Sequence, residues 1–395
     1  MGALSGLKIL DFSTLLPGPY ATMMLADMGA EVLKISMRGK TDIALDYPPY
    51  LEQDPALSAN QAWLNRNKKT MFLNLKKPEA KEIIKKLLSS YDIIMEQNRP
   101  GTMDRLGLGY ETLREINPRL IYCSLTGYGQ TGPMRLRAGH DINYLARSGN
   151  MGCAGRRADG PSLTNIQIAD VAAGAMNCVV AILAAVQYRN TTGKGQHLDV
   201  AMMDGLLPFT SMDGTGCLAG GPEPQREGCR LNGGSAYDFY ETADGRYMSV
   251  GALEPKFWAA FCTAIGCPEL IPGGAEPEDV PALKARIRAV MRTKTQREWV
   301  SVFEQVDACV EPVLTVGEAL REDPQVKARE MVVDVPLPLQ PDVTVRQLGF
   351  AFKMSESPAE YRHGGYPLGY HTHEVLAALG YTPEQMCQLE ETEVC

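Results

Sequence analysis

The sequence is poor in histidine and lacks the motifs by which metals and dinucleotides are commonly bound. Only five of its 395 residues are histidine, and its ten cysteines form neither a C-x-x-C pair nor a metal-ligand spacing. No G-x-G-x-x-G follows the first predicted strand. We therefore expect no metal and no dinucleotide cofactor.

An excess of positive charge is also missing, as is a long hydrophobic run. The net charge of −8 argues against binding to nucleic acid or to a membrane surface, since both need a basic field. The most apolar stretch, 171–186, is shorter than the roughly 20 residues that a bilayer requires. The chain does not begin like a signal peptide, and Glu393-Val394-Cys395 is not a Ser-Lys-Leu type of peroxisomal signal. We expect a cytoplasmic protein whose cysteines remain free thiols.

Short β-type runs alternate with helical patterns in the first half of the chain. We expect strands near 8–12, 31–35, 91–95, 120–125 and 196–200, and helices near 19–28, 78–89, 110–116, 141–147 and 170–189. This alternation predicts a parallel sheet with helices on both faces and ligands at the carboxyl ends of the strands. The helix that begins near Asp170 is apolar on most faces, so we expect it to be buried in the middle of the fold.

The second half predicts a smaller domain. An Asp-Gly turn at 243–245 indicates a β-hairpin of 237–240 with 247–250, and helices are expected near 255–265, 280–292 and 295–305. The overall prediction is an α/β protein with a large Rossmann-like domain from both chain ends, 1–200 and 340–395, and a small α+β domain, 230–325. Stretches rich in Gly or Pro suggest linkers at 201–229 and 326–339.

His140 and Asp170 have the components for moving a proton between the two sides of one carbon. Imidazole titrates near neutrality, and a buried carboxyl can be tuned toward the same range. Asp170 is also a good helix-capping residue, and a helix N-terminus lowers its pKa by less than about 1.5. Desolvation can raise the pKa by about 3–5. If the helix is buried, desolvation dominates and Asp170 becomes a competent base.

Asp141 starts a predicted helix after the Gly-rich loop 127–133. Backbone N–H groups at such a start are unsatisfied and can stabilise an oxyanion, while the Asp141 side chain is best explained as a helix cap. Arg99 and Arg105 flank Pro100-Gly101 just after a predicted strand, at the ligand edge of the sheet. Since the guanidinium fork matches phosphate oxygens, this position suits an anionic ligand.

The chain resembles the family III CoA-transferases over nearly its whole length. The resemblance lies in Leu4-Ser5-Gly6-Leu7-Lys8-Ile9-Leu10-Asp11, Arg99-Pro100-Gly101 and Gly127-Tyr128-Gly129-Gln130-Thr131-Gly132-Pro133. Three further motifs are similar to the α-methylacyl-CoA racemase branch: Gly139-His140-Asp141-Ile142-Asn143-Tyr144, Gly251-Ala252-Leu253-Glu254-Pro255 and Asp307-Ala308-Cys309-Val310-Glu311-Pro312.

The resemblance implies an acyl-CoA substrate and no cofactor beyond the CoA of that substrate. It implies that Asp170 is one base and that His140, paired with Glu254, is the other, with the Asp141 N–H holding the thioester oxygen. It places Arg38, Lys76, Arg99 and Arg105 at the CoA phosphates and adenosine. It also implies an interlocked homodimer in which Glu254 reaches the His140 of the partner chain.

The leading hypothesis is thus a racemase or epimerase that interconverts (2R)- and (2S)-2-methylacyl-CoA by two-base proton transfer through an enolate. CoA transfer between carboxylic acids, with Asp170 as nucleophile, is the alternative. A non-catalytic acyl-CoA-binding subunit is a third possibility, although it predicts loss of Asp170, His140 or Glu254, and all three are present. The segment 230–238 is one residue shorter than in the racemase branch and carries Asn232 where Asp is usual, so the acyl group stays open.

Overall fold

The fold is described from a computed structural model covering residues 2–395. The chain divides into two compact units. The first contains the residues up to Leu145, Ile166–Leu206 and Gln325–Cys395, and the second contains Ala146–Asn165 and Leu207–Pro324. Each unit has its own architecture.

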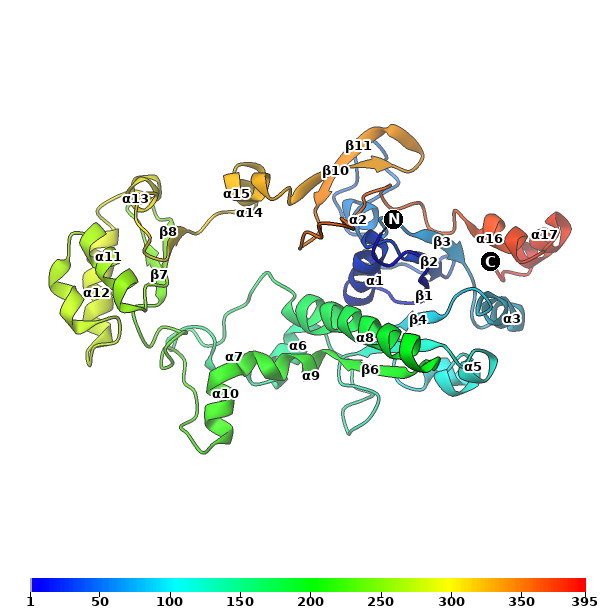
Figure 1. Cartoon of the computed structure of the whole chain (residues 1–395), viewed down its shortest axis with the longest axis horizontal. Coiled ribbons are helices and arrows are strands. Elements are labelled where there is room, and N and C mark those ends of the chain that lie inside the picture. Colours follow the sequence, from blue (N-terminus) through cyan, green and yellow to red (C-terminus); the bar gives the residue numbers. More distant parts are fainter. Residues whose placement is uncertain (1) are drawn as a thin grey trace. The chain divides into compact units, whose positions relative to one another are not determined.

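The first unit is built on a six-stranded parallel sheet (Figure 1). The strands are β1 (Lys8–Asp11), β2 (Glu31–Ser36), β3 (Lys69–Phe72), β4 (Ile93–Glu96), β5 (Ile121–Thr126) and β6 (His197–Ala201). Their order is β3-β2-β1-β4-β5-β6, which is the doubly wound, Rossmann-like arrangement. The predicted parallel sheet is confirmed. β3, which was not predicted, is the additional strand at one edge.

Helices cover both faces of this sheet. Tyr122 of β5 belongs to a core shared with α3 (Pro78–Leu87), α5 (Tyr110–Ile116), α16 (Thr372–Ala378) and α17 (Pro383–Glu391). Cys123, the next residue, faces Cys178 of α8 (Asn177–Thr192). Because successive side chains of a strand point to opposite faces, α8 lies on the other side of the sheet from α5. α8 also packs against α1 (Pro17–Asp27).

The apolar helix predicted from Asp170 is longer and less buried than expected. It starts as a π-helix, η1 (Ala169–Met176), and continues as α8. Only one side is buried, because Met176, Val180 and Tyr188 are 37%, 65% and 47% exposed. At 24 residues the continuous helix is, by length and composition only, able to cross a membrane, which corrects the estimate from the apolar run alone. A core helix passes the same test, and 44% of its most apolar 18-residue stretch is buried.

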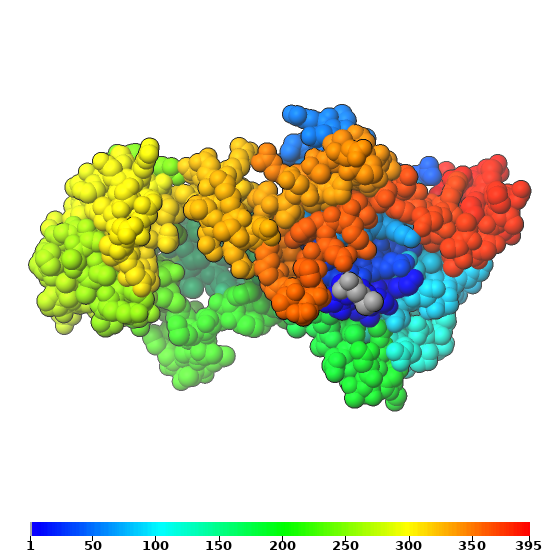
Figure 2. Space-filling view, turned by 45° about the horizontal axis from the view of Figure 1, so that its top comes forward, coloured from blue at the N-terminus to red at the C-terminus, as the bar shows by residue number. Residues whose placement is uncertain are grey.

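The C-terminal part of the chain returns to the first unit. Strands β10 (Val332–Leu337) and β11 (Gln340–Leu348) form a two-stranded antiparallel sheet. Arg66 donates a hydrogen bond to the Leu348 carbonyl, and the Asn74 N–H donates to Val394. Figure 2 shows this orange and red segment against the blue N-terminal residues. The linker predicted at 326–339 therefore contains the whole of β10.

The second unit holds a three-stranded antiparallel sheet in the order β7-β8-β9. The strands are β7 (Asp238–Glu241), β8 (Tyr247–Val250) and β9 (Val310–Pro312), and the predicted Asp-Gly hairpin joins the first two. Its core includes the large aromatic side chains of Trp258, Phe261, Trp299 and Phe303. The helices here are α7 (Asn150–Cys153), α11 (Pro255–Ala264), η3 (Pro268–Gly273), α12 (Val280–Met291), α13 (Gln296–Phe303) and α14 (Val316–Arg321).

Residues 201–229, predicted to be a linker, are partly helical. The first unit takes α9 (Met202–Leu206), and the second takes η2 (Leu207–Thr210) and α10 (Ser211–Leu218). Gly214 lies inside α10, where a Cβ would overlap Thr210. Gly214 and Gly216 are thus accommodated inside α10, where glycines had indicated a linker.

Candidate active site

His140, Asp141 and Asp170 lie together in the first unit. The loop 127–140 leaves the carboxyl end of β5 and leads to α6 (Asp141–Arg147). Asp170 lies in the first turn of η1, and its N–H donates a hydrogen bond to Asp141 Oδ1 at 3.0 Å. Two helix starts are therefore joined at one point.

The environment of Asp170 raises the pKa of its carboxyl. Burial is the largest cause, the nearby Asp141 carboxylate adds to it, and the His140 ring opposes it. Together they raise the pKa from 3.8 to about 6. The increase in pKa caused by desolvation thus outweighs the decrease expected from the helix N-terminus. The carboxyl can take up and release a proton near neutral pH.

His140 is exposed at the start of α6. Its backbone N–H donates to the Asn143 side chain at 3.0 Å, which fixes the entry to the helix. The ring lies close enough to Asp170 to influence its pKa. The two side chains therefore interact electrostatically within the same unit.

The Asp141 side chain does not cap its own helix, contrary to the prediction. Its Oδ1 instead accepts from Asp170 at the start of η1. Asn143 takes the capping role by accepting from His140. Within residues 2–395 no acceptor binds the Asp141 N–H, so this donor is available to an oxyanion.

Arg38 and Lys76 line one pocket of the first unit, with a volume of about 600 Å³. The Arg38 guanidinium lies over the Phe72 ring, 5.2 Å from its centroid. Glu390 and Glu393 also line the pocket and offset part of the positive charge. A ring-bearing anion fits a site with this chemistry.

Arg99 and Arg105 follow β4. Arg99 lines a separate cavity of about 190 Å³ with His197, Ser124 and Gln130. Arg105 ends α4 (Thr102–Arg105) and donates to Thr102 Oγ1 at 3.0 Å. Of the four predicted phosphate-binding residues, the structure brings Arg38 and Lys76 into one pocket and places Arg99 in another.

Glu254 belongs to the second unit, where it is the exposed N-cap residue of α11. The pKa of the Cys309 thiol is raised, mainly by burial and in part by the charge of Glu254. The Gly251–Glu254 segment is thus close to Cys309.

A buried charge network at the carboxyl end of β1 was not foreseen. Asp11 faces Lys34 and Lys68, and all three side chains are at most 1% exposed. Burial alone would raise the pKa of Asp11, but the two lysines with Ser13 and Thr22 hold it at about 2. Burial lowers the pKa of Lys68 to about 8. Nothing in the sequence around Lys68 signals its burial.

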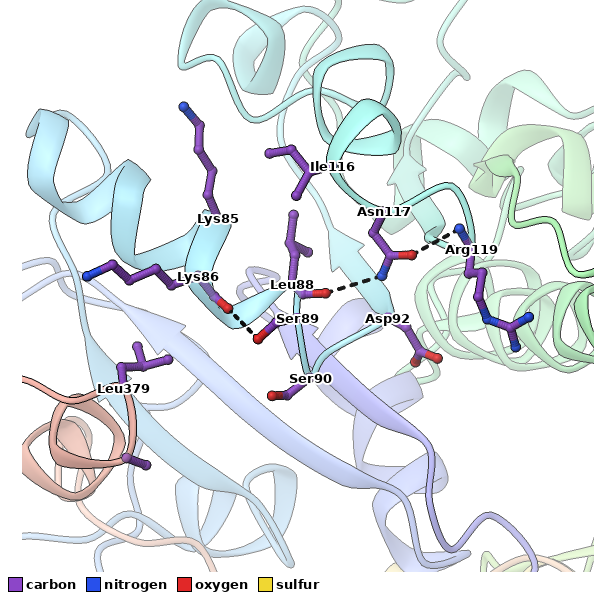
Figure 3. Close-up of a pocket in the computed structure, with 11 residues that line it drawn as sticks. Lys85, Lys86, Leu88, Ser89, Ser90, Asp92, Ile116, Asn117, Arg119 and Leu379 are labelled. Atoms are coloured by element: carbon purple, nitrogen blue, oxygen red, sulfur yellow. Dashed lines mark hydrogen bonds between the residues drawn. The ribbon is translucent and has the colours of Figure 1, made fainter.

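Another pocket of the first unit lies at the amino edge of the sheet, with a volume of about 760 Å³. Lys85, Lys86 and Arg119 line it, but Figure 3 shows that their charged ends point in different directions. Lys85 is paired with Glu82, and Lys86 donates to the Tyr381 hydroxyl. Because its polar groups do not converge, this pocket is a weaker candidate than the site around Asp170.

The chain is similar to known proteins over nearly its whole length. The model of CoA-transferase family III matches residues 4–372. An acyl-CoA transferase of Fusarium pseudograminearum is 35% identical over 99% of this chain and 88% of its own length. The alpha-methylacyl-CoA racemase of Homo sapiens is 32% identical over 99% of this chain and 97% of its own. The crystal structure of a CAIB/BAIF family protein from Brucella suis superposes with a TM-score of 0.83 at 28% identity, covering 96% of this chain and 99% of that one.

Proposed function

The chain belongs to CoA-transferase family III, and from this premise we propose that it interconverts the two enantiomers of 2-methylacyl-CoA thioesters. The observation that carries the proposal is the pairing of His140 with a carboxyl whose pKa is about 6. A two-base mechanism at a carbon acid uses one group on each face of the carbon, and here an imidazole and a carboxyl are offered.

In this mechanism one base removes the α-proton and the other delivers a proton to the opposite face of the planar enolate. Asp170 serves one face and His140 the other, so their roles exchange with the direction of reaction. The free Asp141 N–H donates to the thioester oxygen as negative charge develops there. Loss of such a donor typically costs about 3–4 kcal/mol of transition-state stabilisation.

The CoA part of the substrate is assigned to the basic residues of the first unit. The pocket of Arg38 and Lys76 offers positive charge and the Phe72 ring to an adenosine phosphate. Arg99 and Arg105, on the loop and short helix after β4, are assigned to the remaining phosphates. No other cofactor enters the proposed reaction.

The proposed working form is a cytoplasmic homodimer. The exposed apolar side chains of η1 and α8 favour a covered surface. In this form Glu254 of one subunit would pair with the His140 side chain of the other.

CoA transfer between carboxylic acids is the second candidate, favoured by the similarity to the Fusarium acyl-CoA transferase. The Asp170 carboxylate would attack the thioester carbonyl and release CoA as the thiolate, giving a mixed anhydride. The thiolate would then attack the aspartyl carbonyl, releasing the first carboxylate and leaving aspartyl-CoA. This route uses Asp170 but gives His140 no role as a proton carrier.

Incubation of a single 2-methylacyl-CoA in deuterated water, without an acceptor acid, distinguishes the two candidates. Racemisation predicts loss of the α-proton signal by NMR, with deuterium gained at that carbon. A retained α-proton, together with CoA passing to an added carboxylate and hydroxylamine trapping at Asp170, would establish the transferase instead.

A further inference from the structure

Tyr144 connects the start of α6 to the loop that precedes it. Its hydroxyl donates a hydrogen bond to the Gly139 carbonyl at 2.6 Å. Gly139 is the residue directly before His140, and Asp141 follows. The side chain is 5% exposed, so this hydrogen bond is shielded from water.

Two glycines fit closely around the Tyr144 ring. A Cβ on Gly127 would overlap the ring and lie 2.5 Å from the hydroxyl, and a Cβ on Gly139 would lie 2.7 Å from Cε1. Gly127 follows β5 directly, and its carbonyl accepts from the Met203 N–H at 3.0 Å. The ring therefore joins the end of a sheet strand to the backbone that carries His140.

Tyr128 completes the contact. Its ring meets that of Tyr144 edge to face, with centroids 5.2 Å apart. Burial raises the pKa of Tyr144 to about 12, with the charges of Asp170 and Asp141 among the further causes. The hydroxyl stays protonated, and so remains a donor, over the whole working range of pH.

We propose that Tyr144 is a positioning residue, whose hydroxyl holds the Gly139 carbonyl and thereby sets the places of His140 and the Asp141 N–H. The inference rests on the proposed function for the roles of those two groups. Tyr144 itself needs no contact with the substrate. A displacement of about 1 Å in reacting groups can slow an enzyme by roughly 100-fold. Loss of this single hydrogen bond can therefore have a large effect on kcat.

The test compares Tyr144→Phe with Tyr128→Phe in the full-length protein. Each variant loses one hydroxyl from one of two rings in contact, but only that of Tyr144 bonds the His140 segment. For Tyr144→Phe we expect kcat for deuterium exchange to fall about 10- to 100-fold, in both directions, with KM changed by less than about twofold. Tyr128→Phe should keep a kcat close to that of the wild type.

Two outcomes overturn the proposal: a kcat for Tyr144→Phe within about twofold of the wild type, or a loss confined to KM. If Tyr144→Phe does not fold, Gly139→Ala is the deciding variant, because its added methyl pushes the same segment off the ring. An unchanged kcat there also overturns it. If the wild type transfers CoA but does not exchange, the proposed function fails, and the same variants measured in the transfer reaction still decide the role of Tyr144.

Discussion

Asp170 is a carboxyl whose surroundings favour its protonated form. Ionising it at neutral pH costs folding free energy, because the pKa rises from 3.8 to about 6. One pKa unit corresponds to about 1.4 kcal/mol, so the cost at pH 7 is at most about 3 kcal/mol. The native state holds more protons than the unfolded chain between these two values, and stability therefore falls as the pH rises from about 4 to 6.

Asp170→Asn should separate activity from stability. The rate of deuterium exchange should fall about 10²–10⁴-fold, the usual scale of general acid–base catalysis. Stability at pH 7 should rise by about 1–3 kcal/mol, because a neutral amide replaces a poorly solvated charge. Exchange kinetics and urea unfolding measure the two effects. An unchanged exchange rate would remove Asp170 from the mechanism.

Asp141→Asn addresses the pH dependence. The Asp141 carboxylate raises the pKa of Asp170, so its neutralisation should lower that pKa, while the amide oxygen still accepts from the Asp170 N–H. In the wild type, exchange that uses Asp170 as base should decline as the pH falls through about 6. In the variant this decline should occur at lower pH.

Asp204→Asn, on α9, is the matched control for the pH profile. The charges that act on the pKa of Asp170 are those of Asp141 and His140. Neutralising Asp204 should leave the decline near pH 6. If Asp141→Asn and Asp204→Asn gave the same pH–rate profile, a group other than Asp170 would be responsible for the decline near pH 6.

At the scale of elements, η1 depends on close packing against α9. The side-chain amide of Asn177, the residue after η1, donates a hydrogen bond to the Ala173 carbonyl within η1 at 2.9 Å. A Cβ on Gly205 would lie 2.7 Å from both that carbonyl and that amide. π-Helical turns are rare and frequently lie at functional sites, and here the turn carries Asp170.

Gly205→Ala and Gly174→Ala should therefore differ in stability. At position 205 the methyl meets a backbone carbonyl that cannot move aside, so we expect a loss of about 1–3 kcal/mol. At position 174 the contacts are longer, 3.0 Å to the flexible Met202 side chain and 3.1 Å to the Ala169 carbonyl, and a gain of about 1 kcal/mol in helix propensity offsets them. Thermal unfolding of both variants measures the difference. A Gly205→Ala protein as stable as the wild type would contradict this account of the packing.

The elements that the sequence predicts well are those with a clear period and clear ends. α5 and α6 have the predicted bounds, and Pro78 and Pro255 mark the starts of α3 and α11. β3 was missed because Lys68 and Lys69 hide a short strand among charged residues. β10 was missed because Pro336 lies within it, which a two-stranded sheet tolerates since both strands are edges.

The candidate site was predictable in its residues but not in all its contacts. His140 and Asp170 could be named because an imidazole and a carboxyl near the starts of two predicted helices are groups that can carry a proton. The hydrogen bond between Asp141 and Asp170 joins positions 29 residues apart, and no local pattern encodes it. The burial of Lys68 has the same origin, because it depends on Asp11, 57 positions earlier.

For the whole molecule, the exposed side of η1 and α8 predicts self-association. Val180 is 65% exposed in the middle of this apolar side. Val180→Glu should weaken the proposed dimer and lower activity, because a charge would be buried on association. Analytical ultracentrifugation over a range of concentrations measures the change.

Ile116→Glu is the control for this substitution. Ile116 is 48% exposed on α5, which covers the opposite face of the sheet. It should leave the association state unchanged. A Val180→Glu protein that associates as the wild type does would remove this side of the helix from the interface.

The return of the C-terminal segment has a consequence for synthesis of the protein. The core that includes Leu10 of β1 also includes Leu389 of α17, so it closes only after nearly the whole chain has been made. At about 5–20 residues per second, the first strand waits roughly 20–80 s on the ribosome for the helix that covers it. During that interval the nascent sheet presents bare apolar surface, which makes it a natural client for chaperones that bind emerging chains.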